Sequence, residues 1–355
     1  MSQCPFSNLL DPDTYKEGMP YQMLREVRQA GPVVKMDDPL TGIPYWVVTH
    51  IEDMDFVSKN PKLFSSAARS AFPMEMDEFT VEMQQNTIIN MDPPRHQKVR
   101  RIVRNAFTPK RVDSYEPSFR EHARRIVDAV AAKGECEFVE DVAAELPLIS
   151  ILELLGVPLE DRKQFFTWTN TMIFADDPDM ATSEEEAQLA AMEVIGYAMQ
   201  LAEKHREQPM DNITGGLLDA ELEGGPVSAD MFGWMFILIL VGGNESTRTV
   251  MAQGMRLVME NPDQLQYLVD NPDKISNAVE EMLRYNTAFI SMRRTATEDV
   301  EVGGQLIKAG DKVILHYHAA NHDETVFGDN AMELSLIHIS EPTRPRRQSR
   351  MPASA

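Results

Sequence analysis

The sequence has little cysteine and no long apolar run. Cys4 and Cys136 are the only cysteines among 355 residues, and their unrelated positions argue against a disulfide framework and favour a reducing compartment. The longest apolar run, residues 234–241, is too short to cross a bilayer. Residues 1–18 are polar and acidic, unlike a secretion signal. These absences predict a cytoplasmic protein without a transmembrane segment.

Basic charge is also scarce. The 34 lysines and arginines are outnumbered by 56 acidic residues, and the net charge of −22 disfavours nucleic acid as a partner. A hydrophobic content of 43% over this length can bury a large core, so we expect one domain over residues 1–333. The last 22 residues, 334–355, differ: they carry four arginines and one acid without helix or strand periodicity. We expect that tail to be disordered and foreign to the domain.

Hydrophobic periodicity predicts a mainly α protein with a minor β part. Strand signal is confined to the two flanks, beginning with residues 43–49. Amphipathic or apolar helices are predicted over residues 19–30, 113–133, 146–155, 183–206 and 228–260.

The helix predicted over residues 228–260 contains an unusual centre. Gly242, Gly243, Glu245 and Ser246 interrupt its apolar sequence, although glycine costs about 1 kcal/mol in a helix and a carboxylate there must be solvated or paired. Glycines let a ligand approach the backbone, and an acid beside an alcohol can relay protons. The alternative is a buried helix with a tolerated glycine kink.

Two further helices carry polar pairs on one face. Glu281 and Arg284 lie three apart, a spacing that more often marks a solvated surface pair. Asp92 is a candidate cap for a helix whose first turn holds prolines, and His96 and Arg100 then share one face. A plain basic helix face is the alternative for the second pair.

A predicted hairpin follows near the end of the chain. Alternating apolar residues on both sides of a Gly-Gly turn, within residues 293–314, predict two antiparallel strands. His316 and His318 should share the face of a strand, with His322 nearby. We prefer a plain strand to a metal site there, because no acidic or cysteine partner stands at ligand spacing.

Taken in order, these landmarks resemble the cytochromes P-450, the haem-thiolate monooxygenases. The resemblance implies that Gly242 and Gly243 make room for O2, that Glu245 brings protons from solvent, and that the hydroxyl of Ser246 stands where the family usually has threonine. Thr247 is a third catalytic candidate, although one further residue turns its side chain about 100° around the helix.

The same resemblance implies a cofactor, haem, and its partners. His96, Arg100 and Arg294 would hold the haem propionates, with Arg293 the weaker candidate for the last role, and Glu281 and Arg284 would form a structural ion pair. Electrons would come from NAD(P)H through a ferredoxin reductase and a ferredoxin.

A narrower resemblance concerns the substrate. Residues 145–149, 155–162, 195–199 and 242–245 look like bacterial enzymes that hydroxylate the terminal methyl of the cholesterol side chain, and terminal alkane or fatty-acid hydroxylases come second. By that resemblance the pocket lies within residues 66–90, 171–176 and 288–292. Its apolar candidates are Phe72, Phe174, Ala288, Phe289 and Ile290.

The sequence departs from the family in one respect. The family's axial cysteine lies in a Phe-Gly-x-Gly loop, which this chain does not contain, and neither Cys4 nor Cys136 has the sequence context of a haem ligand. We therefore expect residues 1–333 to lack the haem-cysteine loop and the last helix, and the chain as written to be inactive. The alternative from another class is a non-catalytic helical binder of haem or an apolar ligand.

Overall fold

The computed structural model describes residues 8–173 and 183–336. The chain divides into two compact units. The first, called here the sheet unit, is built from residues 1–85, 89–93 and 253–355, and the second, the helical unit, from residues 86–88 and 94–252. Each is described by itself.

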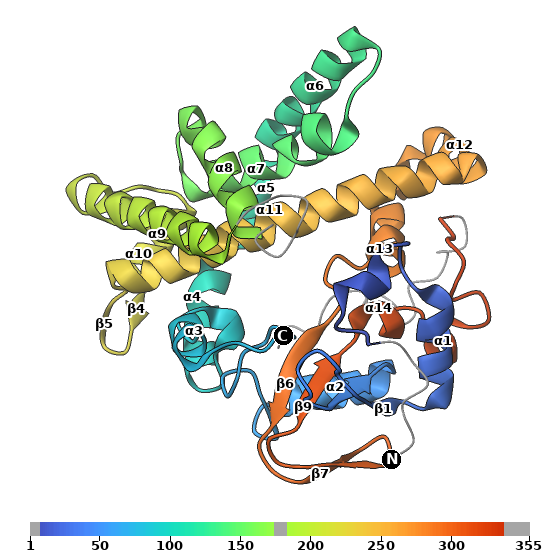
Figure 1. Cartoon of the computed structure of the whole chain (residues 1–355). Coiled ribbons are helices and arrows are strands. Elements are labelled where there is room, and N and C mark those ends of the chain that lie inside the picture. Colours follow the sequence, from blue (N-terminus) through green and yellow to red (C-terminus); the bar gives the residue numbers. More distant parts are fainter. Residues whose placement is uncertain (1–7, 174–182, 337–355) are drawn as a thin grey trace. The chain divides into compact units, whose positions relative to one another are not determined.

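The sheet unit is organised around a five-stranded mixed sheet with the order β1-β2-β9-β6-β3. β2 and β9 pair in parallel, and the other neighbours pair antiparallel. Figure 1 shows β6 and β9 side by side in this sheet. The strands are β1 (Val33–Met36), β2 (Tyr45–Val48), β3 (Phe64–Ser65), β6 (Met292–Ala296) and β9 (Lys312–Leu315).

Both faces of this sheet are covered by apolar side chains. Trp46 and Val48 of β2 join one buried cluster, while Tyr45 and Val47 join another. Successive strand residues point to opposite faces, so the two clusters lie on the two sides of the sheet. Coverage of both faces explains why β2 reads as a continuous apolar run.

Helices and a small hairpin complete the sheet unit. The predicted Gly-Gly turn joins β7 (Val300–Val302) to β8 (Gln305–Ile307), which pair antiparallel. The helices are η1 (Pro12–Tyr15), α1 (Tyr21–Ala30), α2 (Ile51–Lys59), α3 (Glu78–Gln84), α12 (Pro262–Asp270), η5 (Pro272–Lys274), α13 (Ile275–Tyr285), α14 (Tyr317–Ala320) and α15 (Glu324–Phe327). One further short helix, η2 (Ile88–Asn90), lies where the chain passes between the units.

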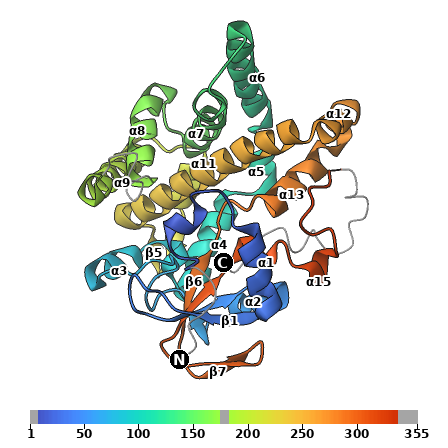
Figure 2. The same ribbon diagram turned by 45° about the vertical axis from the view of Figure 1, so that its right-hand side comes forward.

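The helical unit has one short hairpin and is otherwise helical. Figure 2 shows α8 beside α9, and Phe165 of α8 meets Tyr197 of α9 at a ring-centroid distance of 4.9 Å. Its elements are α4 (Arg95–Ala106), α5 (Pro109–Asp113), α6 (Glu116–Lys133), η3 (Val139–Ala143), α7 (Glu145–Leu155), η4 (Leu159–Asp161), α8 (Arg162–Ile173), α9 (Glu184–Glu207), α10 (Ile213–Leu218), β4 (Glu221–Leu222) and β5 (Gly225–Pro226).

The longest helix is α11 (Ala229–Glu260), with 32 residues. It begins and ends within one residue of the predicted range and stays helical through both glycines. Its residues up to Ala252 belong to the helical unit and those from Gln253 to the sheet unit. In the part of the chain that the structure describes, no helix has the length and hydropathy to cross a membrane.

Two local predictions are wrong, and one helix begins later than predicted. The helix predicted over residues 113–133 is present as α6, which begins three residues later than predicted, at Glu116; Pro117 takes its first turn, a position that needs no backbone donor. His318 lies in α14, so His316 and His318 share no strand face. Asp92 does not cap α4: its carboxylate accepts hydrogen bonds from the Ser65 hydroxyl and from the Ser66 backbone at 2.9 Å.

The chain continues past the predicted boundary at residue 333 as ordered structure for three residues. Leu336 is buried beside Val258 and Ala278, and the Ser335 amide donates to Glu281 Oε1 at 3.2 Å. The tail predicted to be disordered comprises residues 334–355; residues 334–336 are packed as described, and residues 337–355 lie outside the described residues. The domain boundary therefore stays a prediction.

Candidate active site

The polar centre of α11 is held by its own backbone. Ser246 Oγ donates to the carbonyl of Gly242 at 2.7 Å, and Thr247 Oγ1 donates to the carbonyl of Gly243 at 2.9 Å. Each hydroxyl therefore donates its hydrogen bond to the carbonyl four residues earlier in the helix. Its oxygen lone pairs stay available to accept a hydrogen bond from another group. Both hydroxyls lie near the surface of the helical unit.

The two glycines of α11 have different surroundings. A Cβ on Gly243 would lie 2.9 Å from Ile151 Cδ1 and 3.2 Å from its Cγ1, so a larger residue here would force the Ile151 side chain of α7 to shift. A Cβ on Gly242 would meet nothing within 4 Å. Gly243 is thus explained by helix packing, whereas Gly242 leaves open space beside the backbone.

Glu245 does not stand alone. Its carboxylate forms a short ion pair with Arg248 Nη2, and Arg248 Nη1 donates to Asn170 Oδ1 of α8 at 3.1 Å. The Glu245 side chain is 27% exposed, whereas that of Arg248 is 8% exposed. Sequence reasoning missed both partners. The i,i+3 spacing could have revealed Arg248, but Asn170 is 78 residues away and gave no signal.

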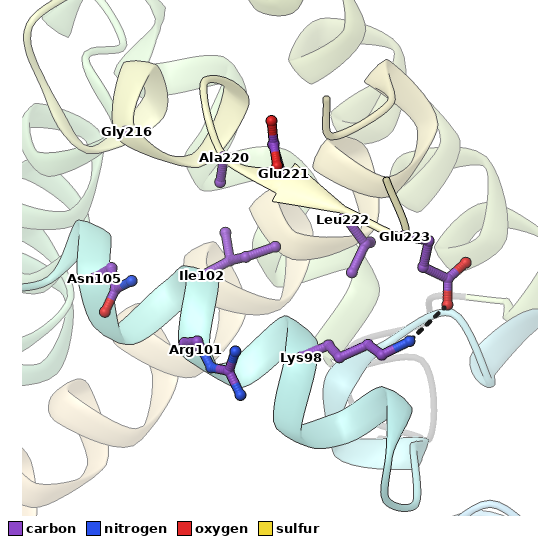
Figure 3. Close-up of a pocket in the computed structure, with 9 residues that line it drawn as sticks. All are labelled: Lys98, Arg101, Ile102, Asn105, Gly216, Ala220, Glu221, Leu222 and Glu223. Carbon is purple, nitrogen blue, oxygen red and sulfur yellow. Dashed lines mark ion pairs between the residues drawn. The ribbon is translucent and has the colours of Figure 1, made fainter. Parts of the chain in front are cut away.

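His96 and Arg100 lie on one face of α4, as predicted, and both are half-buried. Another side of α4 lines a cavity of about 270 Å³ together with α10 and β4 (Figure 3). Lys98 reaches Glu223 across its mouth, with Nζ and Oε1 3.8 Å apart. The cavity residues are Lys98, Arg101, Ile102, Asn105, Gly216 and Ala220–Glu223.

In the sheet unit, the two arginines of β6 have different partners. Arg293 Nη1 donates to Glu75 Oε1 at 2.9 Å. Arg294 is 5% exposed, and its Nη1 donates to the carbonyl of Arg293 at 2.7 Å. Among the described residues, no carboxylate lies within ion-pair distance of Arg294. Burial lowers the pKa of Arg294, opposed by the more distant charges of Tyr317 and Asp92.

Glu281 and Arg284 form a buried, two-pronged ion pair on α13. Arg284 Nε and Nη2 each donate to one oxygen of Glu281 at 2.7 Å. The remaining donors of the guanidinium reach the carbonyls of Asn321, Ala331 and Glu333 at 2.9, 2.8 and 3.2 Å. The pair therefore links α13 to the chain after α14. It is a buried ion pair and not the solvated surface pair that its spacing alone would favour.

The candidate pocket residues lie in two segments of the sheet unit that meet. The Arg293 amide donates to the carbonyl of Ala71 at 2.7 Å, which joins the segment of Phe72 to the end of residues 288–292. Phe72, Ala288 and Ile290 are partly buried, and Phe289 is 37% exposed. Phe174 lies outside the described residues.

The three histidines form a buried cluster instead of a strand face. The rings of His318 and His322 are 4.6 Å apart, and Tyr21 and Tyr285 pack around them. Burial lowers the pKa of His316 and of His322 to about 4. In the described ranges, no group of three or more histidine, cysteine or acidic side chains could hold a metal ion.

The fit of these residues to haem is partial. Arg294 is a buried cation without a carboxylate partner among the described residues, which suits a porphyrin carboxylate. The axial position has no such match: Cys136 is exposed in an irregular segment, and Cys4 lies outside the described residues. The described residues thus suit the edge of a porphyrin and supply no thiolate for its iron.

The sequence is similar to known steroid and lipid hydroxylases. The profile described as Cytochrome P450 matches residues 159–344. Steroid C26-monooxygenase of Rhodococcus jostii (strain RHA1) is 38% identical over 340 residues, or 94% of this chain and 71% of that relative. Methyl-branched lipid omega-hydroxylase of Mycobacterium tuberculosis (strain ATCC 25618 / H37Rv) is 34% identical over 304 residues, or 84% of this chain and 70% of that relative.

The fold is similar to that of solved enzymes. A Mycobacterium marinum cytochrome P450 in complex with pseudoionone matches with a TM-score of 0.85 and 29% identity, covering 96% of this chain and 86% of that chain. The expected fold class, mainly α with minor β, is confirmed. The chain belongs to the cytochrome P450 family of monooxygenases, as its sequence landmarks predicted.

Proposed function

We propose that this chain is the body of an enzyme that hydroxylates the terminal methyl of a sterol side chain, on a cholesterol- or cholestenone-like substrate. The observation that carries the proposal is the 38% identity to a steroid C26-monooxygenase over 94% of this chain. The branched-lipid hydroxylase matches over a smaller share, 84%. Terminal hydroxylation of an alkane or fatty acid is the variant that this second relative favours.

The chain's own contribution is to orient groups and to move protons. Bound haem would supply the activation of O2, so that one oxygen atom enters a C–H bond and the other becomes water. Gly242 would leave room for O2 beside α11. The Ser246 hydroxyl, whose proton is held by the Gly242 carbonyl, would accept a hydrogen bond on the opposite side.

Glu245 would bring protons to this region from solvent. Its partial exposure gives water access to the carboxylate, and Arg248 fixes a resting position for it. Because Arg248 also donates to Asn170, that resting position is tied to α8. The carboxylate must leave Arg248 to deliver a proton, so breaking this ion pair would be part of the free-energy barrier to proton transfer.

The cofactor would be held by its carboxylates. We assign Arg294, His96 and Arg100 to the haem propionates, on the strength of the Arg294 burial and of the shared face on α4. The proposed reaction would need a cysteine thiolate to hold the haem iron, and the described residues do not supply one. The full site therefore requires a cysteine loop that is in frame with this sequence.

The electron donor would be a ferredoxin, reduced from NAD(P)H by its reductase. The support is the charge of α4, whose twelve residues contain five cations and no acid in a chain of net charge −22. Lys98, Arg101 and Arg104 are exposed on this helix. A basic face of this kind suits an acidic electron-transfer protein.

The first test is the coding sequence itself. Sequencing the source DNA across residues 333 and 334 should show an open frame that continues to Phe-Gly-x-Gly and a cysteine. The extended protein, reduced under carbon monoxide, should give the strongly red-shifted Soret band of a thiolate-ligated haem, and the 355-residue chain should not. With cholest-4-en-3-one it should yield the terminally hydroxylated product. A red-shifted band with product from a fatty acid alone would move the proposal to the lipid variant.

The role of Glu245 has its own test. In the extended protein, Glu245→Gln should lower the rate of product formation about a hundredfold or more, as expected for the loss of a positioned proton donor, while substrate affinity stays the same. Glu260→Gln, an exposed acid at the end of the same helix, is the matched control. Unchanged turnover in Glu245→Gln would refute the relay.

A further inference from the structure

The segment between β3 and α3 has no regular structure, yet it is tightly held. Asn90, which is 1% exposed, accepts hydrogen bonds at Oδ1 from the Ala71 amide at 2.7 Å and from Ser70 Oγ at 3.3 Å. Ser70 has a φ of 133°, a backbone conformation that L side chains rarely adopt. The neighbouring contacts therefore impose the path of residues 66–77, called here the entry segment.

The entry segment is also attached to the main sheet. The Arg293 amide donates to the carbonyl of Ala71 at 2.7 Å, which continues the edge pairing of β6 where the short strand β3 has ended. This contact places the residue before Phe72 against β6. It is a backbone bond that does not depend on side-chain identity.

The side-chain attachment is Glu75. Its Oε1 accepts from Arg293 Nη1 at 2.9 Å and from Lys312 Nζ at 3.0 Å. The two cations stand on adjacent antiparallel strands, β6 and β9, and their side chains are 5% and 2% exposed. The Glu75 side chain is 28% exposed, so a partly exposed acid pairs with two buried cations.

One carboxylate therefore compensates two buried cations. Among the described residues, Glu75 is the only acid in ion-pair contact with either one. Burial by itself would raise the pKa of Glu75, but the hydrogen bonds from Lys312 and Arg293 prevail and the pKa is lowered. Burial chiefly lowers the pKa of Lys312, against the attraction of Glu75. If the entry segment moved away, both cations would lose their counter-ion in a desolvated place.

We propose that Glu75, held by Arg293 and Lys312, is a latch that fixes the entry segment against β6 and governs how fast an apolar substrate passes Phe72. The proposal rests on the proposed function, because Phe72 belongs to the predicted substrate pocket. Glu75 and its two cations are positioning residues in this account, since they act through the path of the segment.

The latch can be tested on the 355-residue chain without haem or substrate. Hydrogen exchange read by mass spectrometry should show the amides of residues 70–77 exchanging at least tenfold faster in Glu75→Gln than in the parent. Glu82→Gln is the matched control, because Glu82 is an exposed acid in α3 that forms no ion pair with any residue that the structure describes. It should change exchange of the same residues less than twofold.

A second variant separates the latch from general stability. In Glu75→Gln/Lys312→Met one of the two uncompensated cations is gone, so the thermal midpoint should recover toward that of the parent while residues 70–77 still exchange fast. Should Glu75→Gln fail to fold, this double variant carries the same comparison. Exchange that is unchanged in residues 70–77, or that rises equally in β1 and β2, would overturn the latch.

The rate at which an apolar ligand enters and leaves the predicted pocket can be measured with Nile red, a neutral apolar dye. Stopped-flow mixing should show association and dissociation both several-fold faster in Glu75→Gln, with the equilibrium affinity within twofold of the parent. A loss of affinity without faster association would mean that Glu75 only supports the pocket, and the latch would be rejected. Neither readout needs hydroxylation, so failure of the sterol proposal and failure of the latch are distinguishable.

Discussion

The buried ion pair on α13 makes a quantitative prediction about stability. Replacing Arg284 by Met removes both bonds to Glu281 and the three donors to the carbonyls of Asn321, Ala331 and Glu333. Among the described residues, the Glu281 carboxylate then keeps one donor, the Ser335 amide at 3.2 Å, in a side chain that is 9% exposed. Loss of one partner of a buried pair costs about 3–5 kcal/mol, and the orphaned carbonyls favour the upper half of that range.

Substitution of the acidic partner, Glu281, should lower the free energy of unfolding by less. Glu281→Gln removes the charge but leaves the guanidinium its three carbonyl acceptors and an amide oxygen, so we expect about 1.5–3 kcal/mol, the value of hydrogen bonds to a charged group. The double variant Glu281→Gln/Arg284→Met no longer buries a lone charge. Its destabilisation should therefore fall clearly short of the sum of the two single variants.

Urea unfolding followed by circular dichroism measures these differences. With a slope of about 3 kcal/mol per molar urea, Arg284→Met should lower the midpoint by about 1 M or more. The control is Arg120→Met in the exposed Glu116–Arg120 pair, which should cost less than about 1 kcal/mol. If Arg284→Met behaves like Arg120→Met, or if the double variant is additive, the buried pair does not stabilise the fold in this way.

Two further predictions concern α11 and the histidine cluster. Gly242→Ala should stabilise the protein by up to about 1 kcal/mol through helix propensity, whereas Gly243→Ala should destabilise it through the clash with Ile151 and be rescued by Ile151→Val, as read from thermal midpoints. Because the folded pKa of His322 lies near 4 and below its unfolded value of about 6.5, the stability that it preserves is complete above pH 6.5 and is lost as the pH falls toward 4, by up to about 3 kcal/mol. His322→Phe should flatten this part of the urea midpoint against pH, and an unchanged slope would assign the acid sensitivity to other groups, beginning with His318.

The helices were predictable because their apolar spacing is local. The centre of α11, with Gly242 to Ser246, stood out in the sequence because four residue types there conflict with a buried helix, and α11 extends over the predicted range. Partners distant in sequence gave no such signal. Glu75 meets Arg293 across 218 positions, and nothing in either neighbourhood predicts the other.

Local rules also failed where tertiary contacts compete with them. Asp92 has the residue type and place of a helix cap, yet Ser65 and Ser66 offer its carboxylate two donors from another element, and those contacts prevail. The metal alternative at the histidines was set aside for lack of ligand spacing. The strand assumed there was wrong because α14 begins directly after His316.

The placement of two arginines side by side in β6 limits how this strand can change. Neighbouring residues of a strand face opposite sides, so a shift of pairing by one position would bring Arg294 to the acid that now holds Arg293 and turn Arg293 toward the other face. A deletion or insertion inside residues 292–296 would therefore exchange the two guanidinium groups instead of merely moving them. We expect this strand to tolerate conservative substitution far better than any change in its length.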